Sequence, residues 1–407
     1  MKNHAALILE RRPRQPASAL TKALAGAAAL AVAMGIGRFA FTPVLPMMLQ
    51  DAGLSLASGR WLASANYLGY LIGALSAMRL LVPPERAIRA GLAVIALATL
   101  AMGGVDSVAL WLVLRLLAGV ASAWVLISVS AWCMDALALY QRPFLNSLVF
   151  AGVGGGIAAA GLLCIGLTQW QAGSAHAWAA LGLLALGVTA LIWRFFAHDD
   201  GEAARSTASS AALAAPAVPA ALVWHADALR LVLCYGVFGF GYIIPATFLP
   251  VMARNALQGS AAFAWSWPVF GMAAALSALM VATLVRRWGN RRVWQFCHMV
   301  MAAGIVLPLW SQGLPGILAA ALCVGGTFIV ITLVALQEAR RVAGPGARML
   351  IAAMTSAFAA GQIVGPLTVG AAAGGGGFAS GLMLAAVLLT ASALLLRQPP
   401  PQVGAAI

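Results

Sequence analysis

The chain has 407 residues, of which 63% are hydrophobic and only 8% are charged. Soluble domains carry about 25% charged residues, so this composition excludes a soluble globular protein. The net charge of +14 could suggest a nucleic-acid partner, but the basic residues are spread one or a few per loop and share no basic face. The composition therefore predicts an integral membrane protein that binds no nucleic acid.

Apolar blocks follow one another along almost the whole chain. A membrane-spanning helix needs about 20 mainly apolar residues. Blocks of about this length lie near 20–49, 60–82, 87–104, 107–131, 144–169, 175–197, 228–253, 264–285, 293–311, 314–336, 348–372 and 378–396. The sequence therefore predicts an all-α integral membrane fold with twelve transmembrane helices.

The basic residues outside these blocks indicate the orientation. They concentrate in the N-terminus, in every second loop and in the C-terminus, whereas the intervening loops hold only Arg60 and Arg254. The positive-inside rule then places both termini in the cytoplasm. The first apolar block is longer than the apolar region of a signal peptide, so we expect an uncleaved first helix.

A break in hydrophobicity and an internal repeat divide the chain. Residues 198–226 are rich in Ala, Ser and Pro and are expected to form a cytoplasmic linker between an N-terminal half, 1–197, and a C-terminal half, 227–407. A shift of 204 positions superimposes one half on the other. It pairs Gly35, Gly37, Leu45, Pro46, Met48 and Trp61 with Gly239, Gly241, Leu249, Pro250, Met252 and Trp265.

These features resemble the major facilitator superfamily. The segment "LVLRLLAGVASA" is similar to its fourth-helix motif, with Arg115 and Gly119, and "RRWGNRR" resembles its basic loop between helices eight and nine, with Arg287, Gly289 and Arg291. The matching loop between helices two and three, "RLLVPPERAIR", lacks the usual Asp-Arg-x-Gly pattern. The stretches "GIGRFAFTPVLPMM", "WLASANYLGYLIGAL", "GGTFIVITLVALQEAR" and "GQIVGP" are similar to the YbfB/YjiJ-like bacterial transporters.

The resemblance implies two pseudo-symmetric six-helix halves with a substrate site near the midplane between them. It implies that helices one, four, seven and ten line the cavity. We expect a multi-pass, monomeric transporter in the lipid bilayer of the bacterial inner membrane.

Two arginines lie inside predicted spans, Arg38 in the first and Arg115 in the fourth. A charge at that depth costs about 2.5–3.5 kcal/mol even on the lenient insertion scale. No carboxylate is predicted near the midplane, and a guanidinium presents a planar fork suited to a carboxylate or phosphate. An anionic substrate is therefore the favoured counter-ion. The alternative is that backbone carbonyls satisfy each arginine, or that Arg115 reaches toward Asp106.

Further residues are candidates for the cavity. Tyr242 occupies the repeat position of Arg38, and Tyr67 and Tyr70 share one helix face. His298, near the cytoplasmic end of the ninth span, is interpreted as a satisfied or snorkelling histidine rather than a proton relay. The remaining candidates for substrate binding are polar or aromatic residues on spans, namely Asn66, Trp124, Thr327 and Gln362.

The first span also carries residues expected to bend it. Pro43 and Pro46 remove backbone donors, while Gly35 and Gly37 permit close approach of another backbone. A thin, kinked helix beside a cavity suits a rocking motion. We expect these four residues, together with the family-motif residues Gly119, Arg287, Gly289 and Arg291, to serve conformational change.

The leading hypothesis is a secondary or facilitative transporter of a small organic solute, favoured as an anion, that works by alternating access. Alternatives are an efflux transporter of apolar compounds and a membrane sensor that transports nothing. A coupling proton fits the family, carried by the substrate's own ionisation or by Asp51 or Glu338 at the periphery. The spans show no nucleophile with a base, carboxylate pair or metal cluster, so we expect no enzyme, cofactor or metal site.

Overall fold

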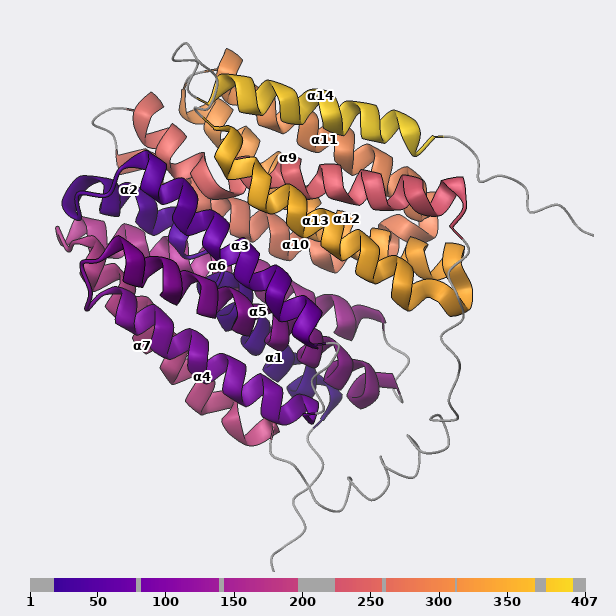
Figure 1. The fold of residues 1–407 in the computed structure, drawn as a ribbon, viewed down its shortest axis with the longest axis horizontal. Coiled ribbons are helices and arrows are strands. Elements are labelled where there is room, and N and C mark those ends of the chain that lie inside the picture. The colour runs from indigo at the N-terminus through magenta and orange to yellow at the C-terminus, as the bar shows by residue number, and fades with distance from the viewer. Residues whose placement is uncertain are drawn as a thin grey trace, which may run out of the picture.

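The structure, a computed structural model, describes residues 18–77, 82–138, 143–196, 224–257, 261–311, 313–369 and 378–397. These residues are almost entirely helical, and no strand occurs among them. The helices form two adjacent groups, with the indigo-to-magenta half below and to the left of the orange-to-yellow half in Figure 1. The predicted linker, 198–226, lies outside the described residues except for its last three.

The N-terminal group supplies six spans. They are α1 (Ala19–Leu30) continued by the π-helix η1 (Ala31–Ile36) and α2 (Phe41–Asp51), α3 (Leu56–Ala77), α4 (Pro84–Met102), α5 (Val108–Ala138), α6 (Pro143–Gln169), and α7 (Ser174–Ile192) with the short 3₁₀ turn η2 (Trp193–Phe196).

The C-terminal group supplies six more. They are α9 (Ala226–Ala256), η3 (Ala261–Trp265) leading into α10 (Ser266–Trp288), α11 (Asn290–Trp310), α12 (Leu314–Ala343), η4 (Gly344–Gly346) leading into α13 (Ala347–Thr368), and α14 (Ala379–Leu395).

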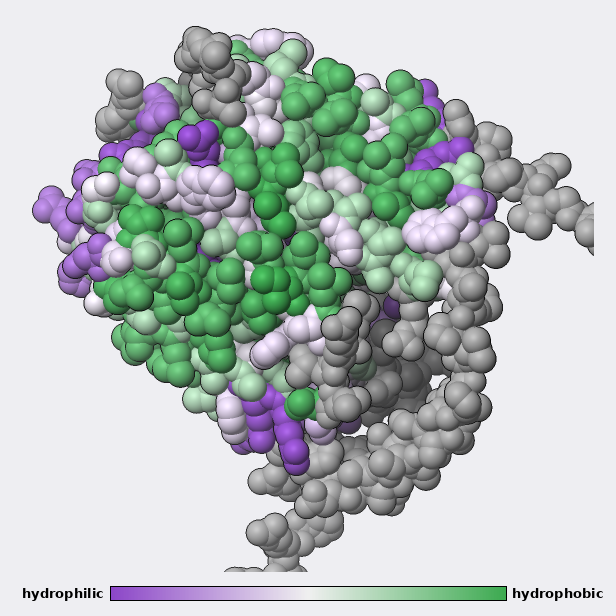
Figure 2. Space-filling view, viewed as in Figure 1, coloured by the Kyte–Doolittle hydropathy of each residue, from purple (hydrophilic) through white to green (hydrophobic). Residues whose placement is uncertain are grey.

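The helices have the length and apolar character that a bilayer requires. Within the described ranges, nine segments are long and apolar enough to cross a membrane, and α14 is an apolar helix of 17 residues. Large side chains such as Leu97, Val113 and Leu191 are exposed on the outside of the bundle. Figure 2 shows these hydrophobic side chains as a broad green surface, with purple, hydrophilic residues at its margins. This pattern fits an outer surface in contact with lipid.

The first span and α9 meet at the pseudo-twofold axis between the halves. Thr42 Oγ1 donates to the Ala246 carbonyl at 2.7 Å, and Arg254 Nη2 donates to Gln50 Oε1 at 3.0 Å. In both pairs the partners are 204 residues apart, the offset of the sequence repeat. Equivalent positions of two copies can touch only at a twofold axis. We call the end of the bundle with Gln50 and Arg254 the Gln50 end, and the opposite end the Arg287 end.

Small residues bring α6 and α10 together across the same interface. A Cβ built on Gly154 would lie 2.3 Å from the Ala275 amide nitrogen, and one built on Gly271 would lie 2.4 Å from the Ala158 nitrogen. The small residues of the segment "GVGGGIAAAG" let this helix pack closely. They serve two contacts, because Gly156 lies equally close to the backbone of Ala31 in the first span.

Candidate functional site

The first span is interrupted at Arg38. The π-helix η1 ends at Ile36, and Gly37 to Ala40 form turns before α2 begins. In a regular helix the amide of residue 43 would bond to the Phe39 carbonyl, but Pro43 has no N–H. The Thr42 amide bonds to that carbonyl instead, at 3.2 Å. The Arg38 carbonyl is thereby left for a donor from another helix.

Arg115 on α5 supplies that donor. Its Nη2 donates to the Arg38 carbonyl at 3.1 Å, and its Nη1 donates to the Gly37 carbonyl at 3.3 Å. Asn66 on α3 also donates to the Gly37 carbonyl, at 3.3 Å, and to the Arg115 carbonyl, at 2.8 Å. Arg115 and Asn66 therefore hold the interrupted segment in place by donating to backbone carbonyls. For Arg115 this is the arrangement in which carbonyl groups, rather than a substrate or Asp106, satisfy the guanidinium.

The Arg38 side chain points across the axis into the C-terminal half. It is 2% exposed, and its Nη2 donates to Gln362 Oε1 on α13. The Gln362 amide nitrogen in turn donates to the Tyr242 hydroxyl on α9. The side-chain amide of Gln362, on α13, thus joins Arg38 of the first span to its repeat partner Tyr242 on α9.

Aromatic rings surround the guanidinium. Its Cζ lies 3.9 Å from the centroid of the Tyr70 ring, 5.4 Å from that of Tyr67 and 5.5 Å from that of Phe39. Ring faces attract cations, by about 2 kcal/mol or more when the pair is desolvated. The Tyr67 hydroxyl also bonds to Thr247 Oγ1 at 2.9 Å, which ties α3 to α9.

Tyr242 lies in a stack of rings that extends through the C-terminal half. Its ring is nearly parallel to those of Phe328 and Phe358, with centroids 5.7 and 5.6 Å away. Phe328 also meets Phe39 edge-on at 6.1 Å, so the stack reaches the interrupted segment. The site is therefore one cation among aromatic rings contributed by both halves.

Among the residues that the structure describes, the carboxylates that form ion pairs lie at the Arg287 end, away from the Arg38 guanidinium. At the Arg287 end, Arg291 pairs with Asp227 and with Glu338, and Arg341 pairs with Glu338 at 2.6 Å. Within the described residues no ion pair involves Arg38 or Arg115, and the Nε atoms of both are buried without a hydrogen-bond partner. The bonded acceptors of both arginines are neutral oxygens.

A family model for "Uncharacterised MFS-type transporter YbfB" matches residues 30–397. The chain belongs to this family. A solved structure of a mutant of the nucleoside transporter NupG is similar at 12% identity and a TM-score of 0.67, covering 92% of this chain and 98% of that one. At this identity the likeness shows the fold, two pseudo-symmetric halves of six helices. A search of curated proteins finds no match.

The predicted substrate residues of this YbfB-type chain divide into two sets. Arg38, Tyr67, Tyr70, Tyr242 and Gln362 lie together in the aromatic site, and Asn66 and Arg115 support it from behind. Trp124 instead donates to Ser76 Oγ at 2.9 Å, farther toward the Arg287 end. Thr327 bonds to its own helix, at the Cys323 carbonyl.

The predicted conformational residues occupy helix crossings and one turn. Gly35 packs on Gly156, Gly37 on Ser122 and Gly119 on the Asn66 carbonyl. Gly289 has a φ of +76°, which favours glycine, and forms the turn between α10 and α11. Arg291 enters the ion pairs described above, whereas Arg287 is exposed.

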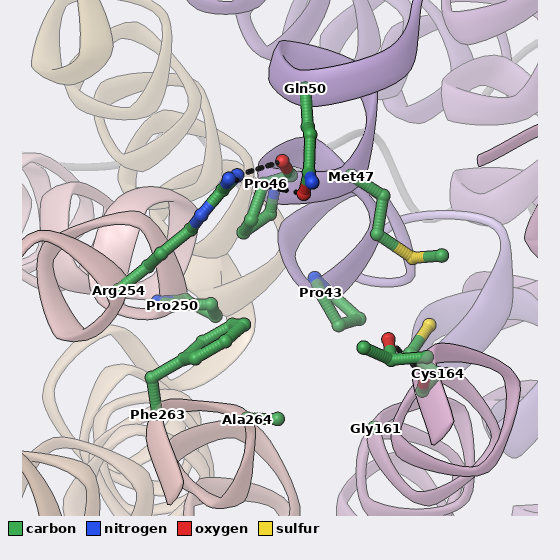
Figure 3. Close-up of a pocket in the computed structure, with 11 residues that line it drawn as sticks. Pro43, Pro46, Met47, Gln50, Gly161, Cys164, Pro250, Arg254, Phe263 and Ala264 are labelled. Carbon is green, nitrogen blue, oxygen red and sulfur yellow. Dashed lines mark hydrogen bonds between the residues drawn. The ribbon is translucent and has the colours of Figure 1, made fainter. Parts of the chain in front are cut away.

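Pro43 and Pro46 line a small pocket between the halves at the Gln50 end (Figure 3). Arg254 reaches over its mouth and donates to the Pro46 carbonyl at 2.5 Å and to Gln50. Arg60 of the N-terminal half likewise donates to the Val369 carbonyl of the C-terminal half. Each half therefore holds a backbone carbonyl of the other through an arginine.

Sequence reasoning missed Phe39, Phe328 and Phe358. Nothing distinguishes them from the many apolar residues of their spans, because a helix that is apolar all round does not show which face is turned to the axis.

Proposed function

We propose that this transporter moves a small organic anion by alternating access, with Arg38 as the anchor for the negative charge. The observation that carries the proposal is the position of Arg38: a buried guanidinium at the axis between the halves, bonded to a neutral amide. A buried cation is normally paired. A substrate carboxylate would complete the pairing that the protein leaves open.

In this proposal Gln362 is a placeholder for the substrate. Its amide oxygen occupies one position on the Arg38 fork, where a carboxylate oxygen would bind more strongly. Displacing Gln362 would break the bridge from Arg38 through Gln362 to Tyr242. Binding would then change a contact between the halves, which is what a rocking mechanism needs.

The contacts between the halves support an assignment of the resting state. Those at Gln50, Arg60 and Ser64 lie between the aromatic site and the Gln50 end or beside it. With the basic loops in the cytoplasm, as the positive-inside rule predicts, the closed Gln50 end faces outward. We propose a monomer in the bacterial inner membrane with both termini in the cytoplasm.

Peripheral acids are poor candidates for proton coupling. Asp51 accepts from the Ser174 amide at 2.5 Å and from its hydroxyl at 2.7 Å, at the start of α7. Glu338 is bound by two arginines. We therefore propose that any proton travels as part of the substrate's own ionisation.

Thermal unfolding of the purified, full-length protein tests the anchor. The panel contains acetate, lactate and benzoate as anions, their amides as neutral analogues, and uridine to represent the ligand class in the name of the structural relative. We expect at least one anion, and none of the amides, to raise the melting temperature. Arg38→Ala should abolish the shift, and Arg38→Lys should weaken it because an ammonium lacks the planar fork.

The matched control is Arg89→Ala, which removes an arginine far from the axis that donates to the Trp193 carbonyl. It should leave the anion shift intact. Stabilisation by neutral compounds alone, or anion shifts that survive in Arg38→Ala, would overturn the anchor. A buried guanidinium also disfavours the alternative of efflux of apolar cations.

A further inference from the structure

The residues around Arg38 indicate the chemical nature of the uncharged part of the substrate. Two side chains that contact Phe39 have buried donor atoms without a partner among the described residues, Arg38 at Nε and Trp267 at Nε1. The centroids of the Trp267 and Phe39 rings are 6.5 Å apart, and Arg38 Cζ lies 5.5 Å from the Phe39 centroid. Behind the site, Arg115 Nε and Asn66 Oδ1 are also buried without a partner in the described part of the chain. Next to the Phe39 ring, the unmet hydrogen-bonding capacity is thus on the donor side, which suits a ligand that is mainly an acceptor.

The apolar part of the site is made of ring faces. Tyr70, Tyr67 and Phe39 approach the guanidinium, while Phe328 and Phe358 lie parallel to Tyr242 at interplanar angles of 1° and 10°. Aromatic rings prefer offset-stacked or edge-on partners. A flat aromatic body would exchange one ring contact for another here, whereas a puckered aliphatic body would separate the stack without replacing its contacts.

Two of these aromatic residues keep a little more exposed surface than the residues at the centre of the site. Arg38 and Tyr242 are 2% and 1% exposed, but Tyr70 retains 7% and Phe358 retains 8% of its surface. Tyr70 lies on α3 and Phe358 on α13, so the two residues come from opposite halves.

We propose that the anion is a planar aromatic carboxylate, with its carboxylate on Arg38 and its ring stacked between Tyr70 of one half and Phe358 of the other. This inference rests on the proposed anion transport and narrows it. The carboxylate takes the place of the Gln362 oxygen. A ligand ring would account for the aromatic faces that surround this anion site.

The test compares rings of matched size in the purified, full-length protein. Calorimetric titration is done with benzoate and phenylacetate, and with their saturated counterparts, cyclohexanecarboxylate and cyclohexylacetate. We expect at least one aromatic member to bind about tenfold more tightly than its saturated partner. Phe358→Leu should remove most of that preference, and Phe358→Tyr, which keeps the ring, should retain it. Phe248→Leu removes a buried ring that packs on Phe378 instead, and should change nothing.

The possible outcomes distinguish the aromatic inference from the proposal of anion transport on which it rests. Equal binding of aromatic and saturated acids that depends on Arg38 would overturn the aromatic inference and leave anion transport standing. Binding of neither series, with neutral compounds binding instead, would overturn both. A preference that survives in Phe358→Leu and in Tyr70→Leu would show that the ring binds elsewhere. Unliganded melting temperatures of each variant establish that it is folded.

Discussion

Gln362 is the residue of the site whose charge can be changed without changing its size. Gln362→Glu would place a carboxylate against Arg38 and form a buried, charge-assisted pair. We expect this variant to lose anion binding at least tenfold while its melting temperature stays equal to or above that of the parent. Titration with the anions of the panel measures the first effect, and thermal unfolding measures the second.

Gln362→Leu provides the opposite change at the same position. It removes the acceptor from Arg38 and leaves a buried cation unpaired, which should cost about 1–3 kcal/mol of stability. An added anion should restore that stability, so the ligand-induced rise in melting temperature should exceed that of the parent. If Gln362→Glu binds anions as the parent does, Gln362 does not compete for the substrate position.

At the scale of elements, the interrupted first span depends on Arg115. Arg115→Lys would replace a fork that reaches two carbonyls by a single ammonium. We expect a loss of about 2 kcal/mol in unfolding free energy, since hydrogen bonds to charged groups contribute about 1.5–3 kcal/mol. Hydrogen exchange of the amides from 37 to 44, apart from Pro43, which has no N–H, should become faster. Arg89→Lys changes a similar fork on a carbonyl in a solvent-exposed setting and should cost less than about 1 kcal/mol.

The crossing of α6 and α10 offers a second test at this scale. Gly154→Ala would place a methyl group 2.3 Å from the Ala275 backbone, which cannot move alone. We expect a destabilisation of about 1–3 kcal/mol, typical of overpacking, and slower transport because the halves no longer close fully. Gly155 is the control, since its added Cβ would meet nothing within 4 Å. Equal stability of Gly154→Ala and Gly155→Ala would show that this crossing tolerates separation.

The helices themselves were predictable, but their local irregularities were not. Long apolar blocks in a bilayer have to be helical, because a backbone in lipid must satisfy its own hydrogen bonds. Gly35, Gly37, Pro43 and Pro46 indicated a bend in the first span. They did not indicate that a π-helix would precede it, or that Arg115 would bind the released carbonyls, because both depend on how α5 meets the first span.

For the whole molecule, the arginines at the Gln50 end predict how easily that end opens. The double variant Arg60→Ala, Arg254→Ala removes the arginine that each half extends to a carbonyl of the other. A loss of about 1.4 kcal/mol multiplies the open population about tenfold. Cys164 lines the pocket below Arg254, so a membrane-impermeant maleimide added on the side of the Gln50 end should label it several-fold faster.

Cys133 is the internal control for this measurement. Its sulfur is buried beside Gly26 within the N-terminal half. Its labelling rate should not change. Faster labelling of both cysteines would indicate general loosening, and unchanged labelling of Cys164 would show that the two arginines do not hold the end closed.

The composition of the site was partly predictable at this largest scale. Arg38 and Gln362 stand out because polar groups are rare in these spans, and the repeat links Arg38 to Tyr242. Arg60 and Arg254 were used only to orient the chain, although both join the halves. Which residues meet across an interface depends on the docking of two bodies, and one sequence contains no direct signal for that.

The contacts between positions 204 residues apart have a consequence for how such a site could arise. In a symmetric pair of identical six-helix chains, any residue on the axis faces its own copy, so an arginine at position 38 would oppose a second arginine. Joining the two copies in one chain lets the facing positions diverge. Here they hold Arg38 and Tyr242 at one level and Gln50 and Arg254 at another. A fused chain can therefore form an axial site with a single charge on one side, whereas a symmetric homodimer cannot.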